Sequence, residues 1–386
     1  MIVILFLLRV AAGVLNGYVN LYYYPGTDTA FFHREGLIEY HLLFNDPKEY
    51  FTNIFSYKEV NHGLFDITDS FWNNLRGNLV IKLLSVFNIF SFGNFFINVI
   101  FYNFLIFFGC IALYRVFINL FPTKKTWLII GIFFLPSLIY FSSGLHKDGL
   151  IFLGLGLVCY NLFFILKEEL TASKIVWLIV GLLIIFLIRN FVLLTILPAL
   201  AAWIISEKSK RFIFQTFIIV YVFFILLFFN IGRIHPSLDL PQYVSERQLA
   251  FIEISKGSNS AIYVSPLFPH FRSFLNNSPQ ALNHSLMRPY LTEKFTVRYI
   301  PPAIEIFIYQ ILFFLFLLFR KPNINPDPFI YFCIFFSLTM MLMIGYTIPI
   351  IGAIARYRSI YFPFLIIPLL CYIDWQKVKR LTYIIK

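Results

Sequence analysis

Charged residues are scarce in this sequence. They make up 13% of its 386 residues, whereas 59% of the residues are hydrophobic and 50 are Phe. A soluble globular domain is about half apolar and about a quarter charged, so this composition excludes an ordinary soluble domain. Apolar runs near the roughly 20 residues that a helix needs to cross a bilayer recur along the chain. The sequence therefore predicts an all-α, polytopic transmembrane protein.

Several other features are absent, and each absence excludes a class of protein. The four cysteines all lie inside apolar runs, with no spacing typical of disulfides or zinc sites. No internal repeat supports the inverted-repeat design of many secondary transporters, and no glycine loop indicates a nucleotide. The formal charge of +12 is spread over connectors, which argues against a nucleic-acid partner. The first 23 residues lack a basic start and predict a retained first span.

About ten spans are expected, and their charges predict an orientation. Lysine and arginine mark the connectors near 124, 167, 208, 320 and 379, which the positive-inside rule places in the cytoplasm together with both termini. This topology makes 24–93 and 232–300 large extracytoplasmic loops of a single integral-membrane domain, 1–386. The expected spans are 2–23, 94–120, 126–142, 149–166, 175–188, 191–205, 212–231, 301–319, 329–348 and 358–373.

The first outer loop holds a candidate general base. Pro25-Gly26 ends the first span, and Thr27 or Asp28 is placed to cap the next helix. Asp28 lies near the expected membrane surface, where a partly dry site would let its carboxylate accept a proton from a sugar hydroxyl. Glu35 is a further acidic candidate in the same loop. A simple helix cap in a solvated loop is the alternative interpretation of Asp28, and 75–90 is typical of an interfacial helix.

Three basic turns interrupt the topological pattern, because they fall on the expected outer side. They contain His146 and Lys147, then Arg189, then Arg356 and Arg358. Arginine forks and lysine charges bind phosphate oxygens, so together these turns predict a site for a lipid phosphate. The alternative is that each side chain extends to phospholipid headgroups.

The second outer loop adds a late polar segment. Arg288 and Arg298 precede Glu305, which lies about one turn inside an apolar span. A carboxylate at that depth is costly and usually paired. Glu305 is therefore either an additional site residue or a structural partner of Arg298.

These features resemble the GT-C superfamily of integral-membrane glycosyltransferases. The resemblance rests on a first span followed by a long outer loop that opens with Gly26-Thr27-Asp28, and on the basic turn Arg356-Tyr357-Arg358 before the last span. The segments PSLIYFSSGLHKDG and ARYRSIYFPF also resemble uncharacterised bacterial membrane proteins found with surface-polysaccharide enzymes. The likeness covers most of the chain through short motifs. The adjacent acidic pair frequent in that superfamily is absent, because Thr29 follows Asp28.

The resemblance implies transfer of a sugar from a polyprenyl-phosphate donor to a glycan or lipid acceptor, on the outer face of a bacterial inner membrane. Asp28 would be the base, and Lys147, Arg189, Arg356 and Arg358 would bind the donor phosphate. No cofactor is required by this chemistry, and the missing second acid leaves a divalent metal open. Two rival classes remain. One is a polysaccharide polymerase or ligase that uses polyprenyl pyrophosphate, with His270, His284 and Arg288 as its chemical groups. The other is a transporter or a non-catalytic assembly partner that contacts membrane lipids.

Overall fold

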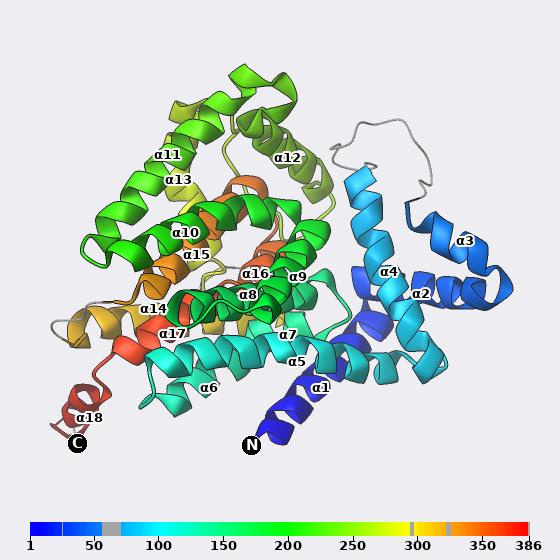
Figure 1. Cartoon of the computed structure of the whole chain (residues 1–386), viewed down its shortest axis with the longest axis horizontal. Coiled ribbons are helices and arrows are strands. Elements are labelled where there is room, and N and C mark those ends of the chain that lie inside the picture. The colour runs from blue at the N-terminus through cyan, green and yellow to red at the C-terminus, as the bar shows by residue number, and fades with distance from the viewer. Residues whose placement is uncertain (25, 56–70, 294–296, 322–325, 385–386) are drawn as a thin grey trace. The chain divides into compact units, whose positions relative to one another are not determined.

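A computed structural model describes residues 1–24, 26–55, 71–293, 297–321 and 326–384. Within these residues every regular element is a helix, apart from two isolated bridges (Figure 1). Apolar side chains face outward along much of helices α1 (Ile2–Tyr18), α11 (Ile213–Ile234) and α14 (Ile300–Phe319), whereas α8 (Lys147–Lys167) is largely buried. This pattern confirms the all-α prediction and is that of an integral membrane protein.

The described residues contain seven helices that are long and apolar enough to cross a membrane, or up to nine if two bent pairs each form one span. The first pair bends by 49° between Phe133 and Pro136, and the second by 62° between Ser359 and Phe362. Proline at the start of the second helix of each pair explains these breaks, because it supplies no N–H to a continuing helix. The expected 175–188 span corresponds to an apolar helix of 17 residues, Ala172–Ile188. The count of ten spans stays a prediction.

Two compact units divide the chain. Unit 1 comprises Met1–Asn119 and Ile132–Leu193, and unit 2 comprises Leu120–Gly131 and Leu194–Lys386. The chain passes from one unit to the other at the end of α5 (Phe95–Leu120) and within helices α6 (Lys125–Phe133) and α10 (Asn190–Ser209). The elements of unit 1 are α1 (Ile2–Tyr18), a π-helix (Val19–Tyr23), α2 (Asp28–Asn45), α3 (Pro47–Thr52), α4 (Phe71–Ser91), α5 (Phe95–Leu120), α7 (Pro136–Ser143), α8 (Lys147–Lys167) and α9 (Ala172–Ile188).

Small residues let the central helices of unit 1 pack closely. A Cβ on Gly156 of α8 would lie 2.4 Å from the Gly109 carbonyl oxygen of α5. On the α9 side, a Cβ on Gly154 would lie 3.0 Å from the Gly181 carbonyl oxygen. Glycine is therefore required where these backbones meet, as in many membrane helix pairs.

The predicted first loop folds as helices in unit 1. Thr27 occupies the N-cap position of α2, as expected, although its side chain makes no capping bond. The segment expected to be an interfacial helix forms α4, which packs along α2 (Figure 1). Asn88 of α4 donates a hydrogen bond to the Gly36 carbonyl oxygen of α2 at 3.0 Å, and Lys82 pairs with Glu39 at 2.5 Å. The two helices form a compact pair, and the extracytoplasmic assignment of this loop stays a prediction.

Unit 2 continues with α11 (Ile213–Ile234), α12 (Leu240–Ser255), α13 (Phe271–Leu282), α14 (Ile300–Phe319), α15 (Pro328–Thr347), α16 (Ile351–Ser359), α17 (Phe362–Tyr372) and α18 (Trp375–Ile384). Its centre is aromatic, with the buried Trp203 ring 5.0 Å from Phe329 and 5.1 Å from Phe332. The predicted second loop supplies α12 and α13. Tyr346 of α15 donates a hydrogen bond to the Phe274 carbonyl oxygen at 2.8 Å and fixes α13 to this core.

Orientation in the membrane can be tested with single cysteines. The four native cysteines are buried, so the wild-type protein is a suitable unreactive background. We expect Ser209→Cys to react with an impermeant maleimide only from the cytoplasmic side, and Gly257→Cys only from the outer side. A Cβ at Gly257 meets no atom within 4 Å, so this change is tolerated sterically. The reverse labelling pattern in intact cells would contradict the orientation.

Candidate functional site

A hydrogen bond joins the first loop to the turn between α7 and α8. The hydroxyl of Thr29, in the first turn of α2, lies 2.7 Å from Nε2 of His146, the N-cap residue of α8. Both residues are buried. The next residue, Lys147, places its Nζ over the Phe32 ring of α2 at 5.1 Å. Asp28, Thr29, His146 and Lys147 therefore lie on two turns in direct contact.

An ion pair brings the second predicted basic turn to the same helix end. Nη2 of Arg189 lies 2.7 Å from Oδ1 of Asp148, and both side chains are buried. Arg189 is the C-cap of α9, and Asp148 lies in the first turn of α8. The break between α9 and α10 thus occurs at Arg189, as the sequence predicted. A buried pair of this kind needs both partners, because one charge alone has no compensation.

Buried polar groups of α1 and α5 contact the turn that precedes α8. Arg9 of α1 is fully buried, and its Nη2 donates a hydrogen bond to the Ser142 hydroxyl at 3.0 Å. Within the described residues, its Nε and Nη1 have no hydrogen-bond partner. Asn103 donates to the Ser143 carbonyl oxygen at 2.9 Å, and the Tyr102 hydroxyl donates to the His146 carbonyl oxygen. These bonds hold the α7–α8 turn firmly against α1 and α5.

The α7–α8 turn packs so closely against α1 that two positions have no room for a side chain. A Cβ on Gly144 would lie 2.2 Å from Oδ1 of Asn16, and one on Gly13 would lie 2.6 Å from the Ser143 carbonyl oxygen. Glycine is therefore required at both positions. We name Arg9, Thr29, His146, Lys147, Asp148 and Arg189, together with Asp28, the α8 N-terminal cluster.

The predicted base and its acidic neighbour differ in their surroundings. Asp28 is exposed at the first position of α2. Glu35 lies further along the same helix, half-buried, and its Oε1 is 3.3 Å from Nε of Arg34. An exposed carboxylate at a helix N-terminus is accessible to an acceptor molecule. This exposure differs from the partly dry site that was expected for Asp28 from the sequence.

The third basic turn belongs to unit 2. Arg358 is almost completely buried, and its Nη1 donates hydrogen bonds to the backbone carbonyl oxygens of Ser285, at 2.9 Å, and Arg288. Its guanidinium also lies 5.3 Å from the Phe362 ring. Arg356 is half-buried in the same helix, α16, near the Tyr357 ring. Arg358 therefore fixes the segment that contains Ser285 and Arg288 to α16, and its expected phosphate role stays a prediction.

Glu305 has a different neighbour from the one the sequence offered. The Tyr309 hydroxyl, one turn along α14, donates a hydrogen bond to its Oε1 at 2.5 Å, and Arg358 acts on it electrostatically. The Arg298 side chain lies outside the described part of the structure. Arg288 forms an ion pair with Glu293 at 2.5 Å. The late charges of unit 2 are thus largely matched with opposite charges.

His284 lies between these groups, in a π-helix that follows α13 (Asn283–Met287), and is buried. Burial and the nearby Arg288 charge lower the pKa of His284 to about 4, so its imidazole is neutral at pH 7. His270 caps α13, where its Nδ1 accepts a hydrogen bond from Ser273 N–H at 3.1 Å. The His270 side chain therefore stabilises the start of α13.

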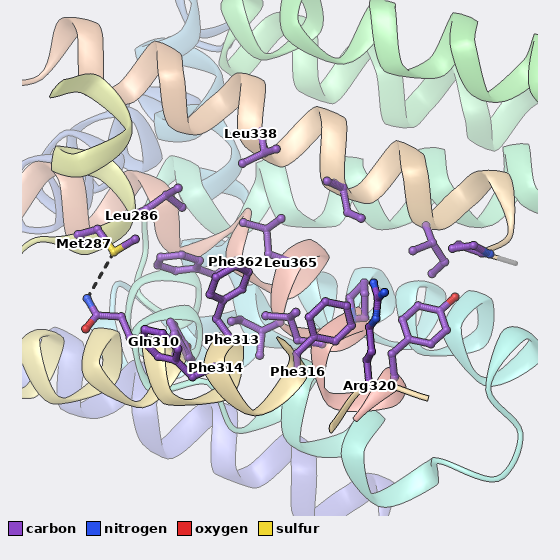
Figure 2. A pocket seen from close by; sticks show the side chains of 18 of the residues that line it. Leu286, Met287, Gln310, Phe313, Phe314, Phe316, Arg320, Leu338, Phe362 and Leu365 are labelled. Atoms are coloured by element: carbon purple, nitrogen blue, oxygen red, sulfur yellow. Dashed lines mark hydrogen bonds between the residues drawn. The ribbon is translucent and has the colours of Figure 1, made fainter. Parts of the chain in front are cut away.

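A cavity of about 1060 Å³ lies within unit 2 between α14, α15 and α17. Its walls are mainly aromatic and aliphatic (Figure 2). Met287 and Gln310 lie at one end, where Gln310 Nε2 is 3.5 Å from Met287 Sδ, and Arg320 lies at the other (Figure 2). The volume is at the upper end of the range of about 300–1,000 Å³ that is usual for ligand pockets.

Among the residues that the structure describes, no group of three or more His, Cys, Asp or Glu side chains is arranged to hold a metal ion. Comparisons with known proteins give no relative: no family model, no curated protein and no solved structure matches this chain. The site must be interpreted from its own geometry.

Sequence reasoning missed part of the α8 N-terminal cluster. Arg9 carries the clearest overlooked signal, because an arginine in the middle of an apolar span is a functional candidate by default. Thr29 and Asp148 had weaker signals, as each is a common residue beside a more prominent one. Asn16, Tyr102 and Asn103 had none, since polar side chains within long apolar runs do not reveal their partners.

The buried ion pair can be tested with a double-mutant cycle. We expect Asp148→Leu and Arg189→Met each to destabilise the protein by about 3–5 kcal/mol, because each leaves a buried charge uncompensated. The double variant should cost less than the sum. Unfolding in mixed micelles measures these differences, and Lys256→Met is the matched control. Its ion pair with Glu253 is exposed, so a change of no more than about 1 kcal/mol is expected. Additive effects of the two buried substitutions would contradict the coupling.

The low pKa of His284 predicts a pH-dependent stability. The folded state keeps this side chain neutral, whereas the unfolded chain binds a proton near pH 6.5, so stability is lost as the pH falls from 6.5 toward 4. Between pH 7 and pH 5 the loss should be about 2 kcal/mol, at about 1.4 kcal/mol for each unit. The difference in unfolding free energy between the wild type and His284→Gln measures it. Identical pH dependence in the two proteins would contradict this assignment.

Proposed function

We propose that this chain is a membrane glycosyltransferase that moves a sugar from a polyprenyl-phosphate donor to an acceptor on the outer face of the bacterial inner membrane. The observation that carries the proposal is the hydrogen bond between Thr29 and His146. It supports the grouping of an exposed carboxylate, Asp28, with the cationic turn at Lys147. The ion pair of Asp148 adds Arg189 to the same group.

The chemistry is a direct displacement at the anomeric carbon. The acceptor hydroxyl gives its proton to the Asp28 carboxylate while its oxygen forms the new glycosidic bond. The bond between the anomeric carbon and the donor phosphate oxygen breaks, and polyprenyl phosphate leaves with the electron pair. Lys147 and Arg189 stabilise the negative charge that develops on this phosphate. The anomeric configuration is inverted.

The buried members of the cluster act as positioning residues in this scheme. His146 holds Thr29, and thereby the first turn of α2, at the start of α8. Asp148 orients the Arg189 guanidinium through one amino nitrogen. Arg356 and Arg358 belong to unit 2 and lie outside this grouping. A phosphate role for them rests on the resemblance alone, and Arg356 is the less buried of the two. Glu35, on the same helix as Asp28, is an alternative candidate for the general base.

A polymerase or ligase that uses polyprenyl pyrophosphate is the second candidate. One observation favours it: Leu286, Met287 and Tyr290 of the late outer segment line the cavity of unit 2. His284 and Arg288 lie in the same segment, and His284 is neutral at pH 7, as a proton acceptor must be. In this case the acceptor would be activated in unit 2, and Asp28 would serve only as a helix-terminal residue.

Replacement of the proposed base separates these candidates. Asp28→Asn keeps the size and the capping ability of the side chain but removes its basicity. We expect sugar transfer to fall by about 10²–10⁴-fold, the typical contribution of a general base. Surface glycan in complemented cells, normalised to the amount of protein in the membrane, measures the loss.

Asp46→Asn is the matched control, because Asp46 caps α3 in the same loop and Asn retains its bond to Glu49 N–H. Near-normal glycan in the Asp28→Asn strain together with a large loss in His284→Gln would move the chemistry to the polymerase candidate. Normal glycan in both variants would favour a non-catalytic partner.

A further inference from the structure

The cavity of unit 2 has one basic end, and this end is rigidly built. Arg320 and Lys321 follow the last turn of α14 and line the cavity. Lys321 N–H donates to the Tyr372 carbonyl oxygen at 3.2 Å, and Asp374 N–H donates to the Phe319 carbonyl oxygen at 2.8 Å. These bonds fix the end of α14 to the end of α17. The two cationic side chains therefore start from a defined backbone.

A third cation lies near the same end. Lys124 acts electrostatically on Lys321, and burial followed by this like charge lowers the pKa of Lys124. The corner is held together by the stacked rings of Trp127 and Trp375, 4.0 Å apart, and by an edge contact of Phe121 with Tyr372. Like charges gathered on a fixed frame favour the binding of an anion.

Two carboxylates lie near this end, and one of them, Asp374, acts electrostatically on Lys124. Oδ1 of Asp327 accepts a hydrogen bond from Phe329 N–H at 2.9 Å. Oδ1 of Asp374 accepts bonds from the N–H groups that begin α18, including Gln376 at 3.2 Å. Within the described residues, the side chains of Arg320 and Lys321 make no hydrogen bond or ion pair with a carboxylate, and both are exposed. Their charges thus remain available to a ligand.

The two ends of the cavity differ in charge. At the Met287 end, Arg288 forms an ion pair with Glu293, and Glu305 acts electrostatically on the buried Arg358. At the other end, Lys124, Arg320 and Lys321 outnumber the neighbouring carboxylates. Between the ends the lining is apolar, with Phe313, Phe316 and Leu338 among its side chains (Figure 2). A molecule complementary to this cavity has one anionic end and a long apolar body.

We propose that the cavity binds an anionic phospholipid, with its phosphate at Arg320 and Lys321 and an acyl chain between α14 and α15. The positive-inside pattern places this end of the cavity in the cytoplasmic leaflet, where anionic lipids supply the headgroup. The basic helix α18 begins at the same corner, as expected for a helix that lies on an anionic membrane surface.

This site is independent of the proposed glycosyl transfer. The donor phosphate is expected on the outer side, whereas Arg320 and Lys321 belong to a cytoplasmic connector. The phospholipid would therefore occupy unit 2 as a bound structural lipid rather than as a substrate. A variant that has lost sugar transfer through Asp28→Asn should still bind the phospholipid. An experiment can therefore contradict one proposal without contradicting the other.

Native mass spectrometry of the full-length protein in detergent tests the site. Phosphatidylglycerol and phosphatidylcholine with identical acyl chains are titrated in parallel. We expect one phosphatidylglycerol to bind in clear preference to phosphatidylcholine. The double variant Arg320→Gln/Lys321→Gln should weaken its binding by roughly 10- to 30-fold, because each basic residue near an anionic headgroup contributes on the order of 1 kcal/mol, somewhat less than one tenfold step.

Two further variants separate the contribution of the lipid headgroup to binding from that of the acyl chain. Leu338→Trp places a larger side chain in the cavity. It should weaken the binding of phosphatidylglycerol although no charge is removed. Lys208→Gln/Arg211→Gln removes two exposed cations of another connector in the same unit and should leave binding unchanged. Glycerol phosphate, which has no chain, should not compete.

Three results would overturn the proposal: equal binding of the two lipids, an equal loss in the Lys208/Arg211 control, or displacement of phosphatidylglycerol by glycerol phosphate. Preferential binding of polyprenyl phosphate over phosphatidylglycerol would also overturn it, since the cavity would then be a site for the donor lipid. If the double variant is poorly inserted, the single variant Lys321→Gln gives the same test with a smaller expected effect.

Discussion

The ion pair between Asp148 and Arg189 joins the start of α8 to the end of α9 inside an apolar helix bundle. Removing two charges from water is costly, and the cost is offset only when the partners meet in good geometry. This requirement fixes where α9 must end and how α8 must begin. His146, two residues earlier at the N-cap of α8, is hydrogen-bonded to the Thr29 hydroxyl and sets the position of the first loop. This buried pair thus joins Arg189 to the other members of the α8 N-terminal cluster.

Unit 2 meets the same requirement in another way. Arg358 is buried against backbone carbonyl oxygens instead of a close carboxylate, so it fixes the late segment to α16. Tyr309 supplies the hydrogen bond that Glu305 needs within α14. The matched charges leave one end of the nearby cavity nearly neutral, whereas the opposite end at Arg320 keeps its positive charge. The cavity therefore has one positive end and an apolar body, which matches the anionic headgroup and the acyl chain of a phospholipid.

Much of the proposed site was foreseeable from residues that are conspicuous in an apolar sequence. Lys147 and Arg189 stood out because charges are rare near apolar spans, and the structure groups them with the first turn of α2 in unit 1. Arg9 was equally conspicuous and was overlooked. The pairing of Arg189 with Asp148 could not be predicted, because the two residues are separated by the whole of α8 and α9 and no periodic pattern links them. The suggested partnership of Glu305 with Arg298 likewise had only proximity in sequence to support it.

The sequence by itself determined the helical class, the presence of long apolar helices and the break at Arg189, whereas the bends beside Pro136 and Pro363 fall within expected single spans. The features that it determined depend on local properties: the length of an apolar run and the cost of a charge in an apolar segment. Tertiary structure alone decided which polar groups meet, where Gly156 and Gly109 allow helices to touch, and that α14, α15 and α17 leave a cavity between them. Such features depend on the relative rotation and bending of helices far apart in the chain, which local preferences do not specify.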